Sequence, residues 1–223
     1  MKRKKCVWLV CILLCISSMV EGQTITVENG IAISSLRKSG YDNRVCPYQI
    51  AVGYEYADKG WFNLSSSIGY LKKGGKMHLN IYEDISSYED VLLKANIHYL
   101  TLNTVFNVKK TFVSGVTAFV GAGPRLDFKL KGSFTCDGPK YEDHETTEEE
   151  AFRNVVLGLK CVVGVNKKLG RIPVGLQFAY LPNLSKMAKE GYACHDRTFT
   201  LGLVIGLPVP LRDKHQVYSV RQK

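Results

Sequence analysis

The chain has 223 residues, of which 45% are hydrophobic and 22% charged, and this composition excludes a disordered protein. Its mean hydropathy is −0.06, and outside the N-terminus no apolar run approaches the length of a membrane-spanning helix, which excludes a multi-helix membrane protein. A membrane β-barrel stays compatible, because its strands are apolar on one face only. The formal net charge of +10 is compatible with a protein that binds nucleic acid.

The N-terminal segment has the layout of an export signal. Residues 1–5 carry four basic side chains, residues 6–20 are an apolar stretch, and the small residue Gly22 allows cleavage before Gln23. We predict a cleavable signal peptide over residues 1–22, with a retained anchor or a lipoprotein signal as the alternative. Its removal takes away four basic residues and one acidic residue, so the charge falls to +7. Export also implies an oxidising compartment, where disulfides form.

Residues 115–131 contain the clearest predicted strand. The even positions from Val116 to Leu130 are apolar apart from Pro124, whereas the odd positions are mostly small or charged. Side chains of a strand alternate between two faces, so this period of two predicts a β-strand with one apolar face. A proline within a paired strand removes a hydrogen bond, so we expect a local bulge at Pro124.

The same alternation recurs along the mature chain and predicts eight strands in all. The other seven cover residues 27–36, 48–56, 62–70, 100–108, 155–165, 172–180 and 199–207. Short turns are expected at 57–60, 109–110 and 166–170, and long polar loops at 37–45, 72–90, 132–152 and 182–196. The pair Gly74-Gly75 is expected to form a plain turn within the second of these loops. Short turns at one end and long loops at the other are typical of an outer-membrane β-barrel.

We therefore predict an eight-stranded antiparallel transmembrane β-barrel with short periplasmic turns and long extracellular loops. The barrel domain covers residues 23–210, and a basic tail covers residues 211–223. Aromatic residues near the turns and loops fit the girdles that such barrels place at both membrane interfaces. A soluble β-sandwich is the alternative fold, although its loops need not sort by length.

The predicted barrel interior is charged. A barrel of eight strands is only wide enough for its own side chains, so charges that face inward should pair with one another. We expect a polar network of Glu55, Arg125, Asp127, Lys129 and Lys160 that fills the lumen. A selective conductance path through these residues is the alternative.

Cysteines and acidic residues gather in the predicted loops. Cys46, Cys136 and Cys194 lie in or beside three different long loops, and two of them could form a disulfide whose pairing the sequence leaves open. Cys161 lies in a row predicted to face lipid, and the cysteine spacings match no metal motif. The acidic run over residues 136–150 is interpreted as a solvated loop, with divalent-cation binding as the alternative.

Four stretches resemble the small outer-membrane β-barrel ("porin family", PorT-like) proteins of Gram-negative bacteria. They are the opening GIAISSL, the segment YLTL, the segment GAGP in the fifth strand and the closing RTFTL. The resemblance implies the barrel fold and an outer-membrane location, and it allows a role in secretion or assembly. It also implies outer-membrane lipid and the barrel-assembly machinery as partners, while a surface or envelope protein partner is left unidentified.

We expect a non-catalytic barrel with a structural or surface-interaction role, without cofactor or metal. The histidines lie in or near loops and in the tail, and no Gly-x-Ser-x-Gly nucleophile motif or Walker-type phosphate loop occurs. The alternatives are a secretion or assembly accessory barrel, a narrow pore and a lipid-modifying enzyme at the rim. Nucleic acid is not expected, because the basic excess is scattered over turns and the tail.

Overall fold

The computed structural model describes residues 24–37, 43–56, 58–84, 87–138, 141–146, 152–187 and 195–209. The predicted signal peptide, the basic tail and Cys194 lie outside these residues. The described chain forms nine strands: β1 (Thr24–Arg37), β2 (Tyr48–Glu55), β3 (Phe62–Asp84), β4 (Ser87–Thr111), β5 (Val116–Gly138), β6 (Tyr141–Thr146), β7 (Val155–Leu169), β8 (Ile172–Tyr180) and β9 (His195–Pro208). No helix in this part of the chain is long and apolar enough to cross a membrane.

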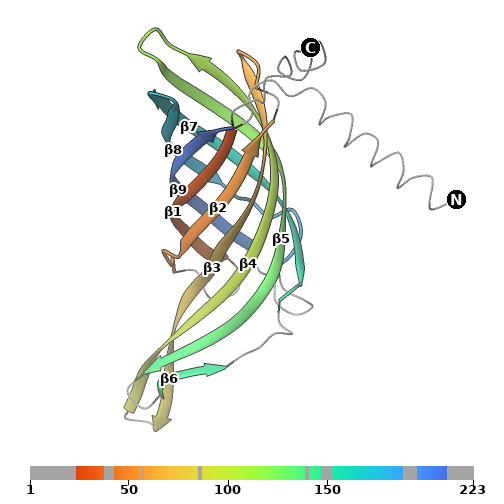
Figure 1. The fold of residues 1–223 in the computed structure, drawn as a ribbon. Helices are drawn as coiled ribbons and strands as arrows, with labels where there is room; N and C mark the ends of the chain where they lie inside the picture. The colour runs from red at the N-terminus through yellow and green to blue at the C-terminus, as the bar shows by residue number, and fades with distance from the viewer. Residues whose placement is uncertain are drawn as a thin grey trace, which may run out of the picture.

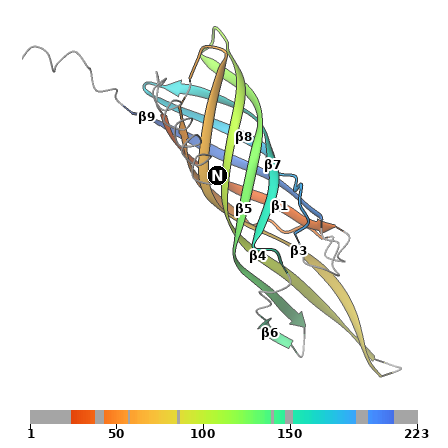
Figure 2. The same ribbon diagram turned by 90° about the vertical axis from the view of Figure 1, so that its right-hand side faces the viewer.

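Eight of the nine strands close into a ring. The order runs β1, β2, β3, β4, β5, β7, β8 and β9, and all neighbours are antiparallel. β9 returns to β1 along the whole length of both strands, from Thr24↔Pro208 to Arg37↔His195. The tilted ring is visible in Figures 1 and 2. The predicted fold class, an eight-stranded antiparallel barrel, is therefore confirmed.

The alternation along each strand sorts side chains between the outside and the lumen as predicted. In β7, Val155, Leu157 and Val163 are 44–51% exposed, whereas Val156 and Val162 are at most 5% exposed. Cys161 lies in the same outward row as Val163 and is half-buried. In β9, Leu201, Leu203 and Ile205 form the corresponding outward row.

The predicted long loop at residues 72–90 is wrong. β3 continues to Asp84 and β4 begins at Ser87, and the two strands pair from Phe62↔Val108 to Asp84↔Ser87. Gly74 and Gly75, expected in a turn, lie within β3 opposite Asn96 and Ala95. At Gly74 a Cβ atom would lie 2.1 Å from the carbonyl oxygen of Ala95, so only glycine fits this close approach.

The prediction failed because the polarity of the two faces inverts partway along the strands. On the ring part of β4 the outward row is apolar, as at Leu102 and Phe106, and the inward row is polar, as at Asn103. Nearer the long-loop end the inward row becomes apolar and buried, at Val91, Ala95, Ile97 and Tyr99, while Lys94 and Asn96 face outward. The strand continues, but its pattern there is that of a sheet in water.

The predicted loop at 132–152 also contains strand. β5 runs on to Gly138, and the short strand β6 pairs with it from Phe134↔Thr146 to Gly138↔Tyr141. Figure 1 shows β3, β4 and β5 extending past the other strands at one end, with β6 beside β5. We call this part of β3, β4, β5 and β6, residues 77–97, 132–138 and 141–146, the strand extension.

Two predicted details of the ring differ from the structure. β4 reaches Thr111, so the turn expected at 109–110 lies at residues 112–115, where Gly115 has a positive φ of 76°. The expected bulge at Pro124 is absent from the β4–β5 ladder. Pairing stops between Asn103↔Arg125 and Phe106↔Ala122 and resumes in the same register, so the proline costs hydrogen bonds without adding a residue.

Candidate functional site

The lumen holds a fully buried lysine. Lys73 comes from β3, and its ammonium group lies 2.6 Å from an Asp196 oxygen and 3.0 Å from an Asp127 oxygen. It also donates to the side-chain oxygen of Asn183 at 3.4 Å. The side chains of Lys73 and both aspartates are 0% exposed, so these ion pairs are shielded from water.

An arginine completes the charge balance around Lys73. Arg125 of β5 is 1% exposed, lies 3.0 Å from an Asp127 oxygen and donates to the carbonyl of Leu159 at 3.1 Å. Asp196 accepts a further hydrogen bond from Thr198 at 2.7 Å. Two cations and two carboxylates therefore form a neutral group, which we call the buried charge cluster: Lys73, Arg125, Asp127 and Asp196. Buried charges need such pairing, since an unpaired one is costly.

A second ion pair lies closer to the short-turn end. Lys160 of β7 reaches Glu28 of β1 at 3.0 Å, and Gln49 of β2 donates to the other Glu28 oxygen at 2.9 Å. Glu28 and Lys160 are each only 8% exposed as residues. Three strands are thus linked by one carboxylate across the lumen.

Two apolar layers alternate with these polar levels along the barrel. The inner layer is Ala32, Leu71, Val105, Val162, Ala179 and Leu181, and the outer layer is Leu36, Ala95, Ile97, Tyr99, Phe152, Val156 and Met187. The inward residues of β1 give the order from the short-turn end: Glu28, then Ala32, then Ser34 beside Asp196, then Leu36. Phe152 and Met187 lie between strands, so these two side chains help to cover the long-loop end.

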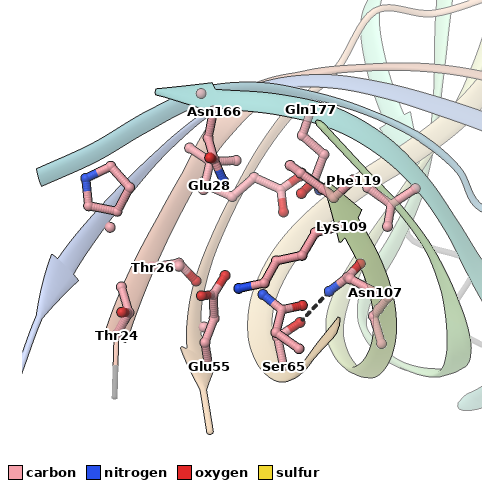
Figure 3. A pocket seen from close by; sticks show the side chains of 18 of the residues that line it. Thr24, Thr26, Glu28, Glu55, Ser65, Asn107, Lys109, Phe119, Asn166 and Gln177 are labelled. Carbon is pink, nitrogen blue, oxygen red and sulfur yellow. Dashed lines mark hydrogen bonds between the residues drawn. The ribbon is translucent and has the colours of Figure 1, made fainter. Parts of the chain in front are cut away.

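The remaining part of the lumen is a cavity of about 240 Å³ at the short-turn end. Its deep end is lined by Glu28, Lys160 and Val162, and at its mouth Lys168 and Arg171 are exposed. Figure 3 shows hydroxyl and amide side chains pointing inward from several strands, together with Glu55, Lys109 and Phe119. The cavity is therefore closed toward the long loops and open toward the short turns.

The predicted polar network is distributed over four places. Arg125 and Asp127 belong to the buried charge cluster, Lys160 belongs to the pair with Glu28, and Glu55 lines the cavity. Lys129 lies apart from all of these and donates to the backbone carbonyl of Phe152 at 3.0 Å. These positions agree with inward-facing charges, but the five residues do not form one network.

Sequence reasoning missed three residues that the lumen depends on. Lys73 and Asp196 lie within the loops expected at 72–90 and 182–196, and the expected interior network does not include Glu28 of the predicted strand 27–36. A signal existed for Lys73, because it follows Asn63, Gly69 and Leu71 on the inward row of β3 at a spacing of two. Its outward neighbours, Lys72 and Lys76, made the segment look like a polar loop.

The loop predictions are tested only in part by the described residues. Cys46 is exposed and Cys136 half-buried, both with free thiols, and because Cys194 is not described the loop disulfide stays a prediction. The side chains of the acidic run from residue 138 onward are likewise not described, so cation binding there is untested. His98 pairs with the hydroxyl of Tyr70 on the outer surface of the barrel.

Comparison with known proteins gives a likeness of fold. No family model and no curated protein matches the sequence. Among solved structures, Neisserial surface protein A aligns with 13% identity and a TM-score of 0.46 over 82% of this chain and 96% of that chain. Ail of Yersinia pestis, solved with the heparin analogue sucrose octasulfate, aligns with 14% identity and a TM-score of 0.41 over 84% and 99%.

A third solved structure is the outer membrane protein OprG from Pseudomonas aeruginosa. It aligns with 10% identity and a TM-score of 0.42, over 84% of this chain and 97% of that chain. Identities this low do not carry ligand or activity from one barrel to another.

Proposed function

We propose that this chain is a non-catalytic outer-membrane β-barrel with a closed lumen and a structural or surface-interaction role. A membrane location is supported by the outer surface of the ring. Large apolar side chains on neighbouring strands are 37–59% exposed there, including Ile68, Val120, Leu176 and Ile205. A continuous apolar surface of this kind is unfavourable in water and is the surface that a barrel presents to lipid.

Aromatic residues lie at both ends of this surface. Trp61 and Phe62 contact each other near the short turns, with ring centroids 4.5 Å apart. Tyr180 and Phe199 stack at 4.9 Å toward the long-loop end. Girdles of this type mark the membrane–water interfaces of β-barrels. The inversion of polarity along β4 supports the same boundary. On the side of Tyr99 toward the strand extension, outward residues such as Lys94 and Asn96 are polar.

The short-turn end is proposed to face the periplasm and the strand extension to lie outside the cell. Thr24, the first residue of β1, pairs with Pro208, the last residue of β9, and both lie at the short-turn end. Long strands that rise above the membrane and carry a polar outer face are suited to contact other molecules. This supports a surface-interaction role over a purely structural one.

The observation that carries the proposal is the closure of the lumen. A solute would have to displace two apolar layers and the buried charge cluster between them. The cluster is held by ion pairs with 0–1% exposure, which makes opening costly. A narrow pore is therefore the less favoured alternative.

Two further alternatives are less supported. A secretion or assembly accessory role, which the PorT-like resemblance allows, would also use the strand extension as a contact surface. A lipid-modifying enzyme would need a histidine beside a nucleophile, and His98 instead contacts the Tyr70 hydroxyl. We propose outer-membrane lipid and the barrel-assembly machinery as partners, with export by the N-terminal signal.

Planar-bilayer recording of the purified mature chain tests the closed lumen. We expect no stepwise current, with a general porin as the positive control, and reproducible current steps would contradict the proposal.

Digestion of intact cells with a glutamate-specific protease tests the orientation. Cleavage should fall within residues 132–152, which contain Glu142, Glu145 and Glu148 to Glu150. Cleavage only after the outer membrane is permeabilised would reverse it.

A further inference from the structure

The cavity at the short-turn end is kept open by glycines in the barrel wall. A Cβ atom at Gly164 would lie 2.4 Å from the Phe119 ring, and one at Gly121 would lie 2.1 Å from the Asn107 side-chain oxygen. These two glycines therefore let Phe119 and Asn107 lie flat against the wall instead of filling the axis. The resulting space of about 240 Å³ is somewhat smaller than pockets for drug-sized ligands, which begin at about 300 Å³.

The charges that line the cavity are largely paired within the protein. Glu28 is neutralised by Lys160, and Asp58 forms an ion pair with Lys109. Lys168 and Arg171 are exposed at the mouth, where water screens them. Glu55 lies in the wall, with its side chain hydrogen-bonded to that of Asn63 and near Lys109. This arrangement attracts neither a free anion nor a metal ion strongly, because both signs are present and mostly paired.

The uncharged lining retains hydrogen-bonding capacity. Asn63, Asn107 and Gln177 are each 6–9% exposed, and each keeps one side-chain polar atom without a partner among the described residues. The last torsion of an amide side chain is soft, so a modest rotation turns these atoms toward the cavity. Two of them are acceptors and one is a donor, and the neighbouring Ser and Thr hydroxyls can act as either.

We propose that this cavity binds a neutral, polyhydroxylated small molecule of about monosaccharide size, which enters from the short-turn end. Each hydroxyl of such a ligand both donates and accepts, and so matches the mixed lining. The Glu55 carboxylate can accept hydrogen bonds from two adjacent hydroxyls, and Phe119 offers a flat apolar face to the carbon side of the ring. This binding site lies on the opposite side of the inner apolar layer from the long-loop end, so it is independent of the surface-interaction role.

Titration of the folded mature chain with D-glucose, followed by nuclear magnetic resonance in lipid nanodiscs, tests this proposal. We expect saturable shifts of the side-chain amide signals of Asn63, Asn107 and Gln177. Val204→Phe places a ring in the cavity and should abolish them, whereas Leu203→Phe, on the lipid face of the same strand, should leave them unchanged. Glu55→Gln should weaken binding about tenfold, since one of the two acceptor oxygens becomes an amide donor and a pair of adjacent hydroxyls can no longer donate to both.

Each outcome of this titration either supports or overturns the proposed binding site. Saturation by D-glucose that Val204→Phe removes and Leu203→Phe retains supports the site. If Val204→Phe fails to show the heat-modifiable gel migration of a folded barrel, Thr26→Val serves instead and should weaken binding by removing one hydroxyl of the lining. Absence of saturable shifts up to about 100 mM glucose overturns the proposal, because a dissociation constant above that concentration is too weak for a specific binding site. Stronger shifts with inorganic phosphate or glycine overturn the ligand class.

Discussion

Replacing Lys73 with methionine removes the cation at the centre of the buried charge cluster. Asp127 then keeps its ion pair with Arg125, whereas Asp196 keeps only the hydroxyl donors Ser34 and Thr198 among the contacts described for it, so one negative charge stays unpaired in a region with 0–1% exposure. Removing one partner of a buried ion pair typically costs about 3–5 kcal/mol, much of it the burial of the remaining charge. The matched control is Lys94→Met, because Lys94 pairs with Asp137 at 3.0 Å but the two side chains are 31% and 53% exposed. An exposed pair contributes about 0–1 kcal/mol.

Urea unfolding of the chain in lipid bilayers measures both variants. Lys73→Met should lower the free energy of unfolding by about 3–5 kcal/mol and Lys94→Met by no more than about 1 kcal/mol. Adding Asp196→Asn to Lys73→Met restores neutrality and should recover part of the loss. Equal costs for the two lysines, or a further loss in the double variant, would refute the assignment of Lys73 to a buried ion pair.

Two further substitutions test the lipid-facing surface and the close packing of strands by the same unfolding measurement. Leu203→Arg puts a charge on the lipid face and should cost about 2–4 kcal/mol, against about 0–1 kcal/mol for Leu169→Arg near the short turns; equal costs would argue against a membrane position. At Gly123 a Cβ atom would lie 1.8 Å from the carbonyl oxygen of Thr104, so Gly123→Ala should cost about 1–3 kcal/mol. Gly60→Ala meets nothing within 4 Å and should stay within about 0.5 kcal/mol, and a harmless Gly123→Ala would show that β4 does not approach so closely.

The ring itself was predictable because one rule applies along most of its length. Wherever apolar residues face outward and polar residues face the lumen, as around Leu102 and Asn103, the period of two marks the strand. The strand extension was not predicted because the polarity of its two faces is the reverse of that in the ring. Around Ala95 and Ile97 the apolar row faces inward, and the outward lysines suggest a loop when no neighbour is known.

The pairing of charges inside the lumen was out of reach for a different reason. Arg125 and Asp127 lie on one strand, so their inward position followed from the local pattern. Lys73, however, lies 54 residues from Asp127 and 123 residues from Asp196 along the chain, and only ring closure brings the three side chains together. Barrel registers are needed before such contacts can be derived.

A tryptophan scan of β9 with brominated lipids tests the central claim, a closed barrel in a membrane, most directly. In a background with Trp61→Phe, single tryptophans replace residues 200–205 of the chain reconstituted in vesicles. Bromine quenches only fluorophores that contact the acyl chains. Quenching should alternate, strong at Leu201, Leu203 and Ile205 and weak at Thr200 and Val204. Uniformly weak quenching along the strand would contradict the account, because the apolar surface would then not face lipid.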